Sequence, residues 1–313
     1  MAYEPTAVRA LPRADVAVST LGVGSTALAG MFAPTSEEEA QATLRAAADA
    51  GLRYFDTAPQ YGQGLGEQRV GRALRELGRE RFILSTKVGK LLTPAGIEFD
   101  YSRAGVLRSV EQSLERLGLE RIDMVFIHDV NRKYHGERVE ERYREAIAGA
   151  VPALAELRRA GAVKAIGVAL NDVDICARFV REAQIDAVML PARYTLLDQS
   201  AADELLPLCA ARGVAVLVAA PFDSGILATG ADGGGSYNYA PPSPEIVQRT
   251  RRIESVCRRH GVALAGAALQ FALAHPAVRS VVVGMRSALE VEANLALMRA
   301  DIPEAFWAEL KKA

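Results

Sequence analysis

Short apolar runs alternate with longer helix-like segments along the whole chain, and this alternation most strongly limits the folds open to the sequence. The runs are apolar at consecutive positions, which is typical of strands buried on both faces of a parallel sheet. Leu21–Gly24 is one such run, and seven more follow at 53–56, 82–87, 122–127, 163–168, 186–190, 214–219 and 279–283. Helical periodicity occupies intervals at 36–50, 66–78, 103–118, 147–160, 172–183, 199–212 and 262–274. Strands separated by helices predict an α/β protein with a parallel sheet.

Local signals support the predicted helices. The segment 36–50 opens with Ser36-Glu37-Glu38-Glu39, which has the spacing of a capping box. Gly118 and Gly213 directly follow two of the other helices, where a left-handed residue commonly ends a helix.

Two architectures fit this element order: an open doubly wound sheet and a closed barrel. The open dinucleotide-binding form is expected to show G-x-G-x-x-G after its first strand. Here the sequence after the first apolar run reads Gly22-Val23-Gly24-Ser25-Thr26, with no third glycine in place. We therefore predict a (β/α)8 TIM barrel formed as one domain by residues 1–313.

Two insertions interrupt the pattern. Residues 228–243 are rich in Gly, Pro and Ser, a composition typical of a mobile lid or a disordered loop. Residues 129–146 are highly charged and directly follow a predicted strand.

Composition excludes several classes of function. The 37 basic and 38 acidic residues give a net charge of −1, which argues against a nucleic-acid partner. No apolar run approaches the ~20 residues needed to span a bilayer, and the charged N-terminus lacks a signal-peptide core, so we expect a cytoplasmic protein without a membrane partner. The three cysteines are widely separated, which predicts neither a disulfide framework nor a metal site. The sequence leaves the oligomeric state open.

Four residues at neighbouring strand ends suggest a catalytic site. Asp56, Lys87 and His128 end or directly follow three successive strands, and Tyr61 lies in the loop after the first of these. In a barrel all four would meet at one mouth. A lysine ammonium close to a tyrosine lowers the phenol pKa, Asp56 can hold the lysine, and His128 can orient a substrate oxygen. Such a set fits carbonyl–alcohol interconversion with a hydride carrier.

These residues lie in motifs through which nearly the whole chain resembles the aldo-keto reductases. The motifs are Tyr54-Phe55-Asp56-Thr57-Ala58-Pro59-Gln60-Tyr61-Gly62, Gly66-Glu67, Val70-Gly71-Arg72-Ala73-Leu74, Ser85-Thr86-Lys87-Val88 and Asp123-Met124-Val125 leading to His128. The resemblance implies that NAD or NADP is the cofactor. It also implies that Tyr61 is the general acid/base, Lys87 lowers its pKa, Asp56 is the partner of Lys87, and His128 orients the substrate.

Further details are similar to the aldose 1-dehydrogenase branch of that family. They include His128-Asp129, His135-Gly136, Ala165-Ile166-Gly167-Val168 and the run from Arg193 to Gln199. This likeness implies oxidation of the anomeric carbon of an L-fucose, L-galactose or D-arabinose type of sugar to the aldonolactone. The alternatives are an NADPH-dependent aldehyde reductase, a pyridoxal 4-dehydrogenase, and a cofactor-binding regulatory subunit without turnover.

The expected cofactor contacts follow the last two strands of the barrel and one earlier strand. The loops after strands seven and eight form the usual phosphate site of this architecture, which indicates Phe222, Ser224, Gly225, Leu227, Gly284 and Arg286. The resemblance adds Asn171 for the nicotinamide amide and Asn294 for the adenine. It also places Glu290 where NADP-preferring relatives carry an arginine, so we expect NAD to be preferred over NADP.

The chain departs from the family pattern at three cofactor positions. Ala169 stands where a serine is common, Pro191 where a glutamine is common, and Phe222 substitutes for a stacking tyrosine. These changes put the expected grip on the nicotinamide amide in doubt.

We expect the substrate side of the mouth to be formed by Met31-Phe32, by residues 129–146 and by the C-terminal segment with Trp307. Arg132, Tyr134 and His135 would give this wall polar groups suited to a hydroxylated substrate.

Overall fold

Eight parallel strands close into a barrel in the computed structural model, which describes residues 2–312. The order around the ring is β10-β11-β12-β3-β4-β5-β8-β9, and β9 pairs with β10 to complete it. The strands are β3 (Leu21–Gly24), β4 (Tyr54–Asp56), β5 (Ile83–Val88), β8 (Met124–His128), β9 (Ala165–Ala169), β10 (Ala187–Pro191), β11 (Ala215–Ala219) and β12 (Val278–Gly284). The predicted TIM barrel is confirmed.

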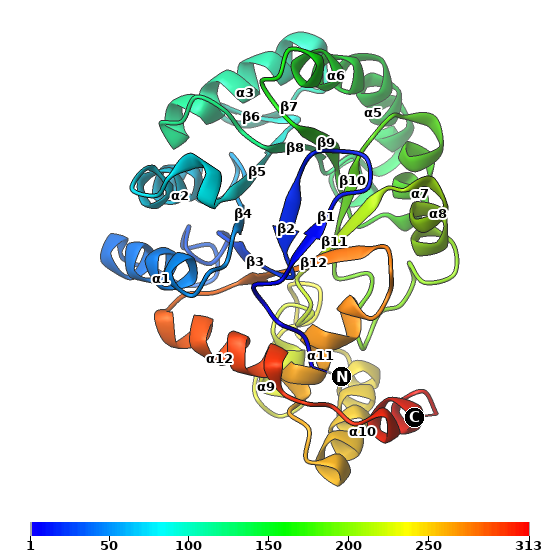
Figure 1. Ribbon diagram of the computed structural model, residues 1–313. Helices are drawn as coiled ribbons and strands as arrows, with labels where there is room; N and C mark the ends of the chain where they lie inside the picture. The colour runs from blue at the N-terminus through cyan, green and yellow to red at the C-terminus, as the bar shows by residue number, and fades with distance from the viewer. Residues whose placement is uncertain (1, 313) are drawn as a thin grey trace.

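The helices surround this ring (Figure 1). They are α1 (Glu37–Asp49), α2 (Leu65–Arg75), α3 (Arg103–Leu117), α4 (Arg132–His135), α5 (Val139–Glu145), α6 (Val151–Arg159), α7 (Val173–Glu182), α8 (Leu205–Arg212), α9 (Ile226–Thr229), α10 (Pro244–His260), α11 (Leu264–Leu273), α12 (Ala288–Arg299) and α13 (Glu304–Leu310). The predicted capping box of α1 is present, since the side chains of Ser36 and Glu39 each bond to the other's backbone N–H. Gly118 and Gly213 adopt the predicted left-handed conformation.

Sequence periodicity missed the longest helix, α10. Ser243 caps its first turn, Pro244 occupies the first helical position, and Gly261 ends it in the left-handed region. These are ordinary start and stop signals. The charged segment 129–146, expected as an insertion, also forms helices, α4 and α5.

Two hairpins were likewise not predicted. The first pairs β1 (Val8–Ala10) with β2 (Ala17–Ser19), and the second pairs β6 (Lys90–Thr93) with β7 (Gly96–Phe99). Figure 1 shows β1 and β2 crossing the centre of the ring. Leu11, Val16 and Val18 of this hairpin pack with side chains that fill the barrel interior, among them Tyr54, Met124, Phe126, Met189 and Leu217. The hairpin therefore covers one end of the barrel, and chemistry is left to the carboxyl ends of the strands.

Within residues 2–312, none of the helices has the length and apolar character that crossing a membrane requires.

The contact between α2 and α3 depends on a glycine without a side chain. A Cβ built on Gly71 would lie 2.1 Å from the carbonyl oxygen of Leu117 and 2.6 Å from its carbonyl carbon. These are backbone atoms at the end of α3, so they cannot rotate away as a side chain would.

Gly71→Ala should therefore lower the free energy of unfolding by about 2–3 kcal/mol, the usual cost of overpacking, as measured by urea denaturation. Gly266→Ala is the matched control, because a Cβ there meets its nearest neighbour, Leu297 Cδ2, at 3.4 Å. Alanine is the better helix former, so the control should be neutral or stabilising by up to about 1 kcal/mol. Equal effects of the two substitutions would contradict this account of the helix contact.

Candidate active site

A buried ion pair links the ends of two neighbouring strands. Asp56 on β4 lies opposite Ser85 on β5, and Lys87 lies two residues further along β5, on the same face of the sheet. Lys87 Nζ is 2.9 Å from Asp56 Oδ1 and 2.7 Å from Oδ2, and it also donates to the Thr57 carbonyl at 2.8 Å. Burial disfavours the charge on Lys87, but Asp56 and Tyr61 together outweigh this effect and raise the pKa of the lysine. The pair is therefore a fixed positive charge next to a fixed negative one.

Tyr61 lies beside this pair in the turn that follows β4. Its ring centroid is 4.9 Å from Lys87 Nζ. Gly66 permits the close approach of α2 to this turn, since a Cβ there would lie 3.1 Å from Tyr61 Cβ and 3.2 Å from Thr57 Oγ1. Burial raises the pKa of Tyr61 to about 12, while the charge of Lys87 acts in the opposite direction. The phenol is therefore a proton donor at neutral pH, and Lys87 favours its phenolate form.

His128 ends β8 on the other side of Tyr61. The two rings are perpendicular, with centroids 6.3 Å apart. Burial lowers the pKa of His128 to about 3, so the imidazole is neutral. Within the described chain its Nδ1 is buried without a hydrogen-bond partner. A neutral imidazole can donate one N–H to an oxygen placed between it and Tyr61.

The four predicted catalytic residues line one cavity of about 520 Å³ at the carboxyl ends of the strands. The wall formed by β11, β12 and β3 carries small residues, namely Gly24, Ala219, Ala220 and Gly284. The opposite wall is polar and aromatic, with Gln60, Asp129, Asn131, Lys133 and Tyr134. The cavity thus has a flat side suited to a planar ring and a polar side suited to a hydroxylated molecule.

Residues 20–313 match the model of the aldo/keto reductase family. The chain belongs to this family. The chain is 40% identical to a pyridoxal 4-dehydrogenase from Microbacterium luteolum, with 97% of this chain and 96% of the relative covered. It is also 40% identical to a D-threo-aldose 1-dehydrogenase from a Pseudomonas species, with 96% and 95% covered. The structure resembles the holo form of an aldo-keto reductase from Bacillus halodurans, with a TM-score of 0.79, 28% identity, and 97% and 95% of the two chains covered.

The mouth of this aldo-keto reductase includes a pair of aromatic residues, Phe32 and Tyr239, of which the sequence predicted one. Phe32 was expected there, but Tyr239, from the Gly-rich segment 228–243, was not. Their rings stack with centroids 6.2 Å apart, and both residues line the cavity. The Tyr239 backbone N–H donates to Ser224 Oγ at 3.1 Å, so residues 228–243 are joined to the loop after β11.

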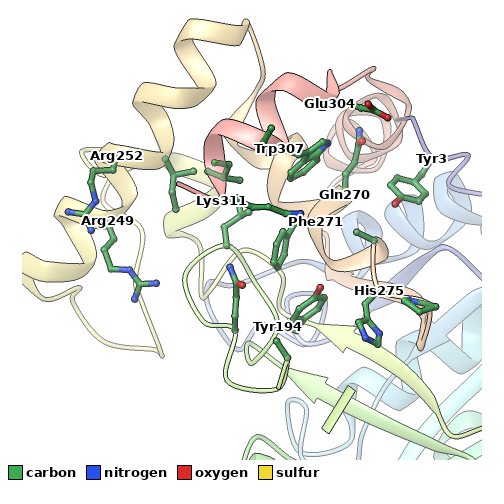
Figure 2. Close-up of a pocket in the computed structure, with 18 residues that line it drawn as sticks. Tyr3, Tyr194, Arg249, Arg252, Gln270, Phe271, His275, Glu304, Trp307 and Lys311 are labelled. Atoms are coloured by element: carbon green, nitrogen blue, oxygen red, sulfur yellow. The ribbon is translucent and has the colours of Figure 1, made fainter. Parts of the chain in front are cut away.

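The expectation that Trp307 borders the mouth is wrong. Trp307, on α13, lines a separate cavity of about 840 Å³ outside the barrel. Figure 2 shows Trp307 near Phe271 of α11, with Arg249 and Arg252 of α10 to one side. α13 packs on α10 and α11 rather than over the strand ends, and this placement separates the C-terminal segment from the catalytic residues.

Of the three polar residues expected on the substrate wall, only Tyr134 lines the catalytic cavity among the described residues. Arg132 pairs with Asp172 and Asp174. His135 is buried behind the wall, 3.1 Å from the hydroxyl of Tyr101.

Two of the residues predicted to bind the cofactor line the catalytic cavity, and the others lie in the segments that follow β11 and β12. Asn171 and Gly284 line the catalytic cavity, and Asn131 Nδ2 donates to Asn171 Oδ1 at 3.4 Å. Ser224 and Gly225 lie in the loop after β11 as expected, and Leu227 lies in the short helix α9 that follows it, whereas the ring of Phe222 packs against apolar clusters. Leu227 is fully buried, so its side chain is not available to a ligand.

Most backbone N–H groups of the loop after β11 already have partners. Gly225 and Leu227 both donate to the Phe222 carbonyl, Asp223 donates to Ala220, and Ile226 donates to Ser236. A phosphate group at this loop, the site expected from the sequence, would compete with these internal hydrogen bonds.

The residues after β12 form a local charge pair. Glu290 Oε2 accepts the backbone N–H of Arg286 at 2.8 Å, and Arg286 Nε lies 3.6 Å from Glu290 Oε1. Asn294, one turn further along α12, is buried.

A buried carboxyl group lies in the loop after β11. Asp223 Oδ2 accepts a hydrogen bond from Thr195 Oγ1, and Oδ1 has no partner among residues 2–312. Burial raises the pKa of Asp223 to about 7 from an ordinary value of 3.8. Because the ionised form is disfavoured in the folded protein, it destabilises the fold as pH rises from about 3.8 to about 7, and the cost is constant above that range.

Asp223→Asn should raise the free energy of unfolding by about 2–4 kcal/mol at pH 8.5, and this gain should shrink steeply below pH 5. Urea unfolding at both pH values is the measurement. Asp232→Asn is the control: Asp232 is an exposed carboxylate that pairs with Arg251 at 2.7 Å, so its neutralisation should not stabilise the protein. A gain for Asp223→Asn that is independent of pH would disprove the assignment of a raised pKa.

Proposed function

We propose that this protein is an NAD(P)-dependent aldose 1-dehydrogenase. It would oxidise the anomeric carbon of an L-fucose, L-galactose or D-arabinose type of sugar to the aldonolactone. The observation that carries the proposal is that all four predicted catalytic residues line one cavity. The wall opposite the glycine and alanine residues of this cavity is polar. The 40% identity to a D-threo-aldose 1-dehydrogenase supports the choice of substrate.

The catalytic cavity has features that fit a nicotinamide cofactor. Gly284 ends β12 at an exposed position, and a Cβ built there would meet only Ala27 Cβ, at 3.7 Å. Gly24, Ala219 and Ala220 belong to the same low wall. Asn171 would hold the amide group of the ring at the edge of the wall. When bound, the cofactor supplies the acceptor for the hydride.

The protein's own residues would manage the proton and the orientation of the sugar. In the phenolate form, which the charge of Lys87 favours against the effect of burial, Tyr61 would take the proton of the anomeric hydroxyl as the carbon–oxygen double bond of the lactone forms and the anomeric hydrogen leaves as hydride. Lys87 stabilises the phenolate that this step requires, and Asp56 keeps Lys87 in place. His128, as a neutral donor, would hold the reacting oxygen.

A second candidate, pyridoxal 4-dehydrogenase activity, is supported by the 40% identity to the Microbacterium luteolum enzyme. Initial rates of nicotinamide absorbance distinguish the two. We expect turnover of L-fucose, L-galactose or D-arabinose to exceed that of pyridoxal. Fast oxidation of pyridoxal with no sugar turnover would favour the second candidate.

Tyr61→Phe should lower kcat for the best aldose by about 100- to 10,000-fold, because the proton acceptor is lost. Calorimetric titration should show nearly unchanged cofactor affinity, since the ring itself remains. Tyr134→Phe is the matched control, as it removes a hydroxyl from the far wall of the same cavity, and its effect on kcat should be small. Retained activity in Tyr61→Phe would refute the proposed role.

We also propose that NAD is the preferred cofactor. Glu290 occupies the start of α12 and already accepts the Arg286 N–H. A 2′-phosphate in this region would meet the carboxylate, whereas a ribose hydroxyl could donate to it.

Glu290→Gln should raise kcat/KM with NADP+ by about tenfold and change the value with NAD+ little, since the amide oxygen can still accept the Arg286 N–H. Adding Arg286→Gln should remove the gain, because the guanidinium that would pair with the phosphate is gone. Steady-state kinetics with both cofactors test this. An unchanged ratio of the two kcat/KM values would count against a role for Glu290.

A further inference from the structure

A second lysine–carboxylate pair lies in the wall of the catalytic cavity, opposite the low glycine and alanine wall. Lys90, on β6, directs its ammonium group to the side chains of Asp129 and Gln60. The Tyr134 ring covers the ammonium, with its centroid 3.9 Å from Nζ. The catalytic roles derived above do not use this pair.

The exposure of the two side chains shows which one a ligand can reach. The side chain of Lys90 is 3% exposed, whereas that of Asp129 is 15% exposed. Both residues of the catalytic pair are more deeply buried than Asp129, at 1% for Lys87 and 5% for Asp56. Among the four side chains of these two pairs, that of Asp129 is therefore the most accessible to a substrate.

Hydrogen bonds to both the side chain and the backbone hold Asp129 in place. Its φ of 55° lies in the left-handed region, which non-glycine residues seldom adopt. Asn131 Nδ2 donates to Oδ1 at 3.0 Å, and the Asp129 backbone N–H donates to the Ala169 carbonyl at 3.1 Å. His135 Nε2 lies 3.1 Å from the Asp129 carbonyl oxygen. Such a residue costs about 1–3 kcal/mol in strain, so its persistence points to function.

Asp129 also remains an acceptor with free capacity. Although burial opposes ionisation, the neighbouring Lys90 ammonium lowers the pKa of Asp129. An ionised carboxylate offers about four lone-pair sites. Lys90 donates to Oδ2 and Asn131 donates to Oδ1, so each oxygen keeps a lone pair for a further donor.

We infer that Asp129 is a specificity residue that accepts a hydrogen bond from the substrate hydroxyl on the carbon next to the reacting carbon. Asp129 Oδ2 lies 3.6 Å from Nε2 of His128, the residue whose imidazole would hold the reacting oxygen. Neighbouring hydroxyl oxygens of a sugar are separated by roughly one hydrogen-bond length, about 2.8 Å. An oxygen held by His128 thus brings its neighbour within reach of Asp129.

The sign of the charge decides which substrates this contact favours. A neutral hydroxyl donates to the carboxylate, a simple aldehyde has no group to offer, and an anionic neighbouring oxygen is repelled. Asp129 therefore favours a neutral polyhydroxylated substrate. This inference rests on the proposed aldose oxidation.

The test compares D-arabinose with its 2-deoxy analogue, 2-deoxy-D-erythro-pentose, in the wild-type protein and in Asp129→Asn and Asp129→Ala. We expect wild-type kcat/KM to be about 10- to 100-fold higher for D-arabinose. In Asp129→Ala this preference should fall to within about threefold of unity, because kcat/KM for D-arabinose falls more than the value for the 2-deoxy sugar, whereas Asp129→Asn should keep part of the preference, since its amide oxygen can still accept a hydrogen bond. Asp172→Asn, an acid that pairs with Arg132 outside the cavity, is the control and should keep the wild-type preference.

Three outcomes overturn the inference. Equal wild-type rates on the two sugars would do so without any variant, and so would a preference that survives undiminished in Asp129→Ala. Equal losses on both sugars would indicate a structural role for Asp129 instead. Separately, a wild-type protein that oxidises no aldose would refute the proposed function, and this inference with it.

Discussion

The buried Lys87 ammonium is the interaction on which the site depends. An ammonium has three donors, and here the two Asp56 oxygens and the Thr57 carbonyl accept them. Lys87 is 1% exposed, and a charge buried to that extent is tolerated only with such complete pairing. Because its donors are directed to these acceptors, Lys87 acts on Tyr61 mainly through its charge. The closed ring makes this possible by placing β4 and β5 side by side, with Asp56 opposite Ser85.

Backbone strain is concentrated at the same end of the barrel. Asp129, Ala192 and Ala220 directly follow β8, β10 and β11, and each has a positive φ between 50° and 55°. Left-handed non-glycine residues cost about 1–3 kcal/mol each, and the continuous hydrogen bonding of the ring can hold them. Their effect is to turn the chain sharply at the strand ends, where side chains must point into the cavity. The strain and the chemistry therefore occupy the same loops.

The sequence predicted what depends on local pattern. Buried strands show as apolar runs, and the order of these runs placed Asp56, Lys87 and His128 at successive strand ends, where the structure has them. The position of Trp307 could not be predicted this way, because it depends on how α13 packs on α10 and α11. Tyr239 was missed for the same reason: the segment 228–243 has no periodicity, yet it crosses to Phe32. Lys90 was missed because the β6–β7 hairpin that carries it lies outside the repeating pattern.

The two lysine–carboxylate pairs of the cavity have the same composition and different surroundings. In the first, the ammonium of Lys87 faces the ring of Tyr61, and both partners are almost fully buried, at 1% exposed for Lys87 and 5% for Asp56. In the second, Lys90 lies behind and the carboxylate of Asp129 is the more exposed partner. The first pair therefore stabilises negative charge on the phenol of Tyr61, and the proposed proton transfer needs this charge whichever substrate is bound. The second pair presents an acceptor at the opposite wall, which only a substrate with a donor there can use. Each lysine is buried next to its own counter-ion. One cavity can therefore hold both a cation that stabilises the Tyr61 phenolate and a carboxylate that accepts from the substrate.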